Sequence, residues 1–367
     1  MDYIANIGGS LTGSVLFASS TNYFISGQVY CNGAVTVEPT VFKCAVGAFI
    51  ELNSTLTLRN VGPYRPVICT GVDDDTVGQS LTNYPGSGYT GVINTNGYAC
   101  PALYMGTTSL SITNFRFCYA QSAVCYPTAA GASATVTLSH CQLVNCIRGI
   151  LLCCGGGCGC GCGSGCGSGC GCGCGGCGSV TVTLNNTLLA GAQYPFWFGG
   201  VGNPVGVAAT HCTLANGSAL LGGSWSGFVG PFTSTNCTYA ALGLPASGWG
   251  GVGACNGFYN ASPAFGASQF AASAWPFQSV GAGNFYLTDA SGWRGVGATS
   301  GVPAAVLAAL AKRTTYPPLV TANAVLTMSQ TLWPQAARNT GPPDLIRFPK
   351  LFTAERSEPR ERSGARR

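Results

Sequence analysis

Charged side chains are scarce in this 367-residue chain, which has 16 Lys and Arg and 11 Asp and Glu residues, or 7% of the total. Eight of these lie in Glu355–Arg367. The rest of the surface must therefore rely on neutral Ser, Thr, Asn and Gly. Nucleic-acid binding needs clustered Lys and Arg together with aromatic residues, and the sequence has no such patch. We predict no nucleic-acid partner.

Long hydrophobic runs are also missing. No segment approaches the roughly 18 uninterrupted apolar residues of a membrane helix, so we predict no membrane span. Residues 1–22 lack the basic start, sustained apolar stretch and small-residue cleavage site of a signal peptide. We expect them to form a poorly ordered or incomplete first coil, as they would if the reading frame began inside a longer gene.

Helix-length periodicity is nearly absent, and short β patterns take its place. Between Gly27 and Asn60, brief apolar runs are separated by Asn-Gly, Glu-Pro, Val-Gly and Asn-Ser pairs. Strands this short cannot each bury a face alone, so copies of themselves must cover them. Apolar residues make up 46% of the chain, enough for a core despite its 55 glycines. The pattern predicts an all-β solenoid.

A repeated frame, Val-x-Leu-x-(His/Asn)-x-x-(Leu/Phe), supports this architecture. Two clear copies are VTLSHCQL at Val136–Leu143 and VTLNNTLL at Val182–Leu189. The polar anchors of the copies are Asn114, His140, Asn186, His211 and Asn236. A period in the twenties is typical of one turn of a parallel β-helix. We therefore expect a parallel β-helix over residues 23–301, with the anchors in one column.

Several longer segments also carry a resemblance. They are TVEPTVFK, GPYRPVICTGVDDDTVG, ALYMGTTSLSITNFRFCYAQSAVCY and KRTTYPPLVTANAVLTMSQTLWPQAARNTGPPDL. Between them, from about residue 25 to Leu345, the chain resembles uncharacterised right-handed parallel β-helix proteins of Verrucomicrobia and Planctomycetes type. The resemblance implies a right-handed coil and a secreted or cell-surface protein. It implies no assigned reaction and no catalytic residue.

The repeat is interrupted at residues 61–102, where Gly, Pro, Asn and Tyr dominate. We interpret this segment as a long excursion from the coils. It contains the densest acidic cluster, Asp73, Asp74 and Asp75, near Arg65. Three carboxylates could bind Ca²⁺, but adjacent strand residues point to alternate faces. A solvated turn with local side-chain bonds to the backbone is favoured.

The two histidines, His140 and His211, stand where Asn stands in neighbouring copies. This exchange favours a column of hydrogen-bonded polar side chains over a catalytic or metal-binding pair. Cys141, Cys212 and Cys237 directly follow the anchors. We interpret them as small core residues, with Cys212 and Cys237 close enough for a disulfide.

Three further segments differ in composition from the coils. Residues 153–178 contain only Cys, Gly and Ser; a thiolate metal site is one interpretation, and a flexible Gly/Cys loop is favoured. The stretch VPAAVLAALAKRT at Val302–Thr314 predicts a short capping helix, within a C-terminal cap region at 302–345. Residues 346–367 predict a disordered charged tail, with an arm for an acidic partner as the alternative.

Two function classes fit this sequence. Because no Ser/His/Asp order, HExxH motif or P-loop occurs, we assign no catalytic, cofactor-binding or metal-binding residue and no cofactor. The favoured function is a non-catalytic exported or cell-surface solenoid, structural or adhesive, or contacting extracellular polysaccharide through Thr, Ser, Asn and Tyr. The alternative is a lyase or glycoside hydrolase that acts on an acidic polysaccharide. Its acids and bases would come from Glu38, Glu51, Asp73–Asp75, Lys43, Arg59 and Arg65.

Overall fold

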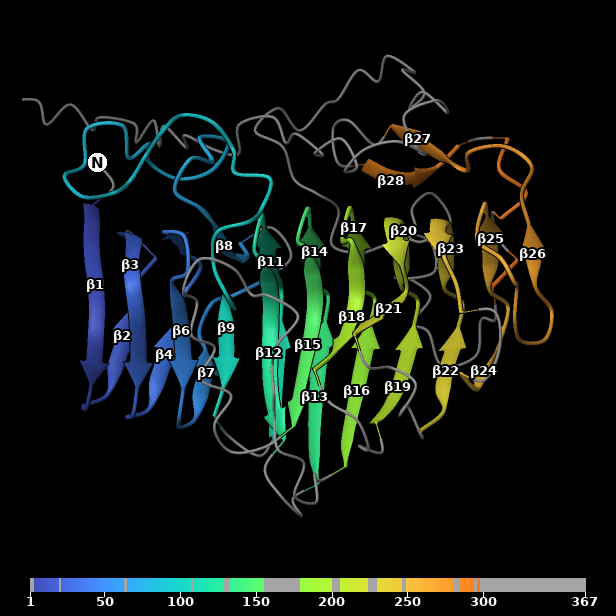
Figure 1. The fold of residues 1–367 in the computed structure, drawn as a ribbon, viewed down its shortest axis with the longest axis horizontal. Helices are drawn as coiled ribbons and strands as arrows, with labels where there is room; N and C mark the ends of the chain where they lie inside the picture. The colour runs from blue at the N-terminus through green and yellow to red at the C-terminus, as the bar shows by residue number, and fades with distance from the viewer. Residues whose placement is uncertain are drawn as a thin grey trace, which may run out of the picture.

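The structure is a computed structural model. It describes residues 3–19, 21–62, 65–106, 109–128, 133–154, 179–199, 205–223, 230–245, 249–279, 284–288, 290–293 and 296–297. Within these ranges every regular element is a β-strand, and the strands stack side by side in successive coils (Figure 1). Neighbouring coils pair in parallel. The described part of the chain is therefore an all-β parallel solenoid, which confirms this part of the predicted class.

Each central coil contributes three strands, and the equivalent strands of successive coils pair to form three faces of the solenoid, which we call the first, second and third walls. The first wall contains β5 (Val41–Cys44), β8 (Val67–Gly71), β11 (Phe115–Cys118), β14 (Gln142–Val144), β17 (Leu188–Ala190), β20 (Thr213–Ala219), β23 (Thr238–Gly243), β25 (Gly257–Tyr259) and β26 (Phe270–Ala271). The second wall contains β6 (Phe49–Leu52), β9 (Leu103–Met105), β12 (Ser122–Thr128), β15 (Arg148–Cys154), β18 (Tyr194–Phe198) and β21 (Leu221–Gly223). The long strands β1 (Tyr3–Leu11) and β3 (Thr21–Cys31) extend across both.

The third wall is a six-stranded sheet. It contains β10 (Ser109–Thr113), β13 (Ala134–Ser139), β16 (Val180–Asn185), β19 (Val205–Thr210), β22 (Phe232–Thr235) and β24 (Gly251–Ala254). In the first coils, β2 (Val15–Phe17), β4 (Val35–Val37) and β7 (Leu56–Leu58) form a separate three-stranded sheet at the equivalent place in the chain. An antiparallel hairpin, β27 (Phe277–Ser279) and β28 (Asn284–Leu287), follows the last coil.

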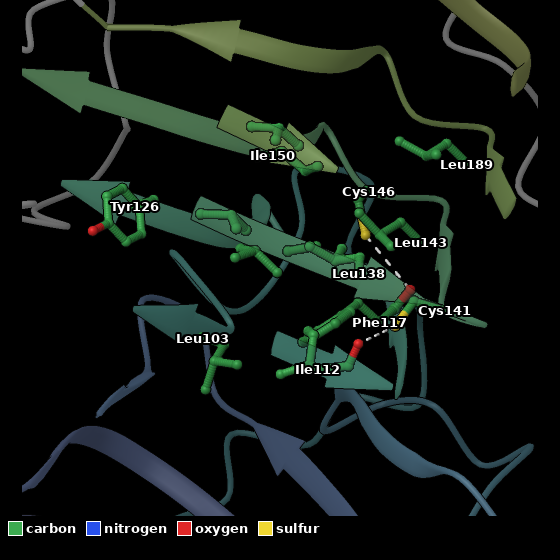
Figure 2. Close-up of a cluster of buried hydrophobic side chains, with 14 of the residues drawn as sticks. Leu103, Ile112, Phe117, Tyr126, Leu138, Cys141, Leu143, Cys146, Ile150 and Leu189 are labelled. Carbon is green, nitrogen blue, oxygen red and sulfur yellow. Dashed lines mark hydrogen bonds between the residues drawn. The ribbon is translucent and has the colours of Figure 1, made fainter. Parts of the chain in front are cut away.

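The core lies between the three walls and follows from strand alternation. In β13, buried Val136 and Leu138 alternate with more exposed Thr135 and Thr137, because successive side chains of a strand point to opposite faces. Figure 2 shows Leu138 in the resulting apolar interior, where aliphatic and aromatic side chains from successive coils gather. Each coil is thus covered by its neighbours, as the short strands require.

The bends between walls require left-handed backbone. Asn114, His140, Asn186, His211 and Asn236 have φ between 48° and 57° and link the third wall to the first. Asn and His are enriched in this conformation, which most side chains avoid. A second set of positive-φ residues, Tyr119, Asn145 and Gly191, links strands of the first wall to strands of the second, and Asn216 has positive φ within β20, before β21. The repeated Asn and His therefore mark bends in the coil.

The structure differs from the sequence prediction at two places. Val67–Gly71 belongs to the solenoid as β8, which pairs with β5 and β11, so the interruption at 61–102 is not continuous. Near the N-terminus, the first strands β1 and β2 pair with β3 and β4. The stack therefore begins before residue 23, where the sequence had predicted a poorly ordered or incomplete coil.

Other predictions fall on parts of the chain outside the described residues. They are the helix at 302–314 with the cap region to 345, the tail at 346–367, and residues 155–178 of the Gly/Cys tract. In chain order, this tract lies between β15 in the second wall and β16 in the third.

Candidate functional site

The column of polar anchors is present at the first bend, as predicted. Backbone bonds join successive coils: His140 N donates to Asn185 O at 2.9 Å, and Asn186 N donates to Thr210 O at 2.8 Å. The side-chain atoms Asn186 Nδ2 and His140 Nδ1 lie 2.8 Å apart. Burial lowers the pKa of His211 from its usual 6.5. The column joins one coil to the next through side-chain and backbone bonds, which is a structural role.

The cysteines after the anchors are buried, as predicted, and they also donate hydrogen bonds to backbone carbonyls. Cys141, Cys212 and Cys237 expose 1% or less of their surface. The Cys212 thiol lies 3.3 Å from Thr210 O, a carbonyl of the bend. Thr187 stands at the same position in another coil, and its hydroxyl makes the corresponding bond at 3.1 Å. These residues are small donors that satisfy bend carbonyls, and Cys212 and Cys237 are free thiols.

Asp73 and Asp74 are buried and Asp75 is half-buried, so the predicted solvation is wrong, whereas the predicted local side-chain bond to the backbone is present at Asp74. Asp74 and Lys43 expose 1% and 0% of their surface. The Lys43 ammonium donates to the backbone carbonyl of Asp74. The Asp74 carboxylate accepts from Thr70 Oγ1 at 2.5 Å and from Thr76 N at 3.0 Å. Burial lowers the pKa of Lys43, and the three neighbouring carboxylates oppose that shift.

Asp73 and Asp75 accept hydrogen bonds from later residues of the excursion, between Tyr89 and Tyr98. Asp73 accepts from Gly91 N at 2.8 Å and from the buried Tyr98 hydroxyl at 2.8 Å. Asp75 accepts from the Tyr89 hydroxyl. Burial raises the pKa of Tyr98, so this phenol remains a donor. The carboxylates therefore hold the irregular chain after β8 against the first wall.

No group of three or more His, Cys, Asp or Glu side chains in the described ranges is arranged to hold a metal ion. The predicted proximity of Arg65 to the acids is also not seen: Arg65 is exposed and forms a bridge with Gly62. The buried guanidinium near Asp74 is that of Arg116, whose Nε donates to Gln142 Oε1 at 2.8 Å. The cluster is an internal anchor.

The acids and bases of the lyase hypothesis do not converge on one open site. Glu38 pairs with Arg59 at 2.8 Å beside the ends of β4 and β7. Glu51 lies on β6 in the second wall, whereas Lys43 and Asp74 are enclosed on the first. A catalytic acid and base must both reach one substrate position. The structure brings Glu38 together with Arg59 and, at a separate place, the three Asp residues together with Lys43. Of this second group, Lys43, Asp73 and Asp74 are buried and Asp75 is half-buried.

The outer face of the six-stranded sheet carries small uncharged side chains in three in-register rows. One row is Ser109, Thr135, Thr181 and Gly206; the next is Ser111, Thr137, Thr183, Ala208, Thr233 and Val252; the third is Thr113, Ser139, Asn185, Thr210, Thr235 and Ala254. All of them are exposed or half-buried. Contacts on this hydroxyl face must use hydrogen bonds and shape, because it offers no charge.

Part of the hydroxyl face is hollowed along β19. Gly206 and Ala208 have little or no side chain, so the surface dips between Thr181 on β16 and Thr233 on β22. The resulting groove has a volume of about 310 Å³ and is open to solvent. Its two sides are separated by two strand spacings, roughly 10 Å.

The sequence contains a signal for this face that the repeat frame did not isolate. Thr-x-Thr recurs at Thr135, Thr181 and Thr233, on strands of three different coils. Alternation places both threonines of each pair on the same side of the sheet.

No protein-family model, curated protein or solved structure matches the chain. The described residues include no helix long and apolar enough to cross a membrane.

Proposed function

We propose that this protein is a non-catalytic exported or cell-surface solenoid that holds a neutral polysaccharide chain in the groove along β19. The observation that carries the proposal is an open, uncharged groove on the hydroxyl face. A neutral glycan offers many hydroxyl groups and no charge, which matches both the polarity and the neutrality of this surface.

The groove suits an extended chain for two reasons. Its floor, Gly206 and Ala208, leaves room for a sugar ring to lie against the sheet. Its sides carry the hydroxyls of Thr181 and Thr233, which can donate and accept hydrogen bonds. With few polar groups and no aromatic side chain in the lining, one groove should bind weakly. Binding would be strengthened by several molecules on the same polymer.

We propose no turnover because the carboxylates named as candidate acids are engaged in hydrogen bonds or an ion pair away from the groove. Asp73 and Asp74 accept hydrogen bonds inside the excursion, and Glu38 is paired with Arg59. None of these three acids lines the groove. General acid–base chemistry needs its groups within hydrogen-bond reach of the substrate. We therefore place the lyase or hydrolase function second.

The proposal includes two features beyond the parallel stack. The coil is right-handed, as crossovers between parallel strands almost always are. The protein is exported, as its resemblance to exported β-helix proteins implies.

A combined binding and turnover assay tests the function. The purified chain is incubated with neutral β-glucans and xylan, and with pectate, alginate and glycosaminoglycans, with and without Ca²⁺. We expect co-sedimentation with a neutral polymer, no unsaturated product absorbing in the ultraviolet and no new reducing ends. Product formed from an acidic polymer, and lost in Asp74→Ala that still folds, would establish the lyase instead.

A further inference from the structure

The complete part of the hydroxyl face lies on β10, β13 and β16, and it shares Thr181 with the groove. Every outward position on these strands carries a hydroxyl or an amide. This grid consists of Ser109, Ser111 and Thr113, then Thr135, Thr137 and Ser139, then Thr181, Thr183 and Asn185. The strand pairing is continuous, with no bulge between partners. The grid is therefore a regular array in two directions.

The dimensions of the grid follow from strand geometry. Neighbouring coils are about 4.8 Å apart, and alternate residues along a strand are about 6.7 Å apart. Threonine is branched at Cβ and has few rotamers, so its hydroxyl and methyl groups repeat with the backbone. Behind the grid, Val136, Leu138, Val182 and Leu184 are fully buried. A close-packed core of this kind makes the array rigid.

A rigid and periodic surface selects a ligand that is also rigid and periodic. Sites for single small molecules are concave, and most of their lining is apolar, whereas the outward side chains of the grid are all polar. The grid carries no charged side chain. Each threonine offers a hydroxyl that can anchor water and a methyl group around which water must order.

We propose that the grid binds the surface of ice crystals. The repeat distances above are similar to oxygen repeats on ice faces, so water bound to neighbouring hydroxyls can continue the crystal lattice. Water that bridges polar groups is nearly as favourable as a direct hydrogen bond. Repetition over nine positions turns many weak contacts into attachment to a solid. This activity is separate from glycan binding, because the grid does not need the Gly206–Ala208 floor.

The test is ice growth in supercooled solutions of the full chain. The wild type should produce faceted crystals and a gap between melting and freezing points that grows with protein concentration. Thr137→Lys, at the centre of the grid, should reduce that gap at least tenfold. Thr57→Lys is the matched control, because Thr57 is an exposed threonine on β7 in the separate three-stranded sheet, and it should retain full activity.

Two further measurements keep the outcomes distinct. Circular dichroism and thermal melts must show that Thr137→Lys is folded. Thr233→Ala, which removes a hydroxyl from the far side of the groove, two strands from β16, should leave ice shaping unchanged while weakening glycan binding. Unshaped crystals with no freezing gap in the wild type would overturn the proposal, as would full activity in folded Thr137→Lys. Binding to a crystalline polysaccharide through Thr137, without ice shaping, would also overturn it.

Discussion

The left-handed bend at Asn186 gives a prediction whose size can be worked out. Asn186 has a φ of 48° and is 7% exposed, and its side chain bonds to His140. Asn186→Ala loses that hydrogen bond, worth about 1 kcal/mol. It also places an ordinary side chain in left-handed backbone, at about 1–2 kcal/mol. We expect the free energy of unfolding to fall by about 2–3 kcal/mol.

Asn186→Gly separates the two contributions. Glycine loses the same hydrogen bond but adopts positive φ without strain. We therefore expect it to be about 1 kcal/mol more stable than Asn186→Ala, although it deletes more of the side chain. Urea unfolding, followed by far-ultraviolet circular dichroism, measures both variants.

The neighbouring Asn185 is the matched control. It lies in β16, and its side-chain Nδ2 donates one long hydrogen bond of 3.5 Å to Ser139 Oγ. Asn185→Ala should change the free energy of unfolding by less than about 0.5 kcal/mol. Equal losses for Asn186→Ala and Asn186→Gly would refute the argument from backbone strain. A loss at Asn185 as large as that at Asn186 would refute the special role of the bend.

Three further predictions concern the buried groups. Cys212→Thr should be more stable than Cys212→Val in urea, because Thr keeps a donor for the bend carbonyl, as Thr187 does; equal stability would contradict this. Asp74→Ala should lower the free energy of unfolding by about 3 kcal/mol, because the buried Lys43 ammonium loses the carboxylate that most favours its charged form; a loss below about 1 kcal/mol would contradict this electrostatic coupling. Burial holds the pKa of His211 below the unfolded 6.5, so stability present above pH 6.5 is lost as pH falls through the folded-state pKa. Melts of His211→Asn should depend less on pH in that range, and an unchanged profile would contradict the assignment.

The architecture could be predicted because each coil of a solenoid carries a copy of the same sequence pattern. Spacing alone placed Asn114, His140 and Asn186 in one column, and the exchange of His with Asn indicated a shared structural role. The reason for those residue types was missed. Their positive φ is a backbone property, and the pattern of apolar residues around them reports only which side chains face the core.

Features that depend on distant parts of the chain could not be predicted. Val67–Gly71 lies among Pro, Gly and Asn residues, and only its pairing with β5 and β11 defines it as a strand. Lys43 occupies an outward position in β5, which normally predicts exposure. It is buried because Asp73–Asp75, about 30 residues later, fold the excursion over it. The groove likewise exists only because small residues of β19 lie between threonines of two other coils.

The measurement that tests the central claim most directly is affinity electrophoresis of the wild type and Ala208→Trp. Native gels contain either a neutral β-glucan or pectate, and each is run at low and high salt. We predict that the β-glucan retards the wild type equally at both salt concentrations, because the groove has no charge to be screened, and that folded Ala208→Trp is not retarded. Equal retardation of both proteins, or salt-sensitive retardation by pectate alone, would contradict the assignment of the groove along β19 as a neutral-glycan site.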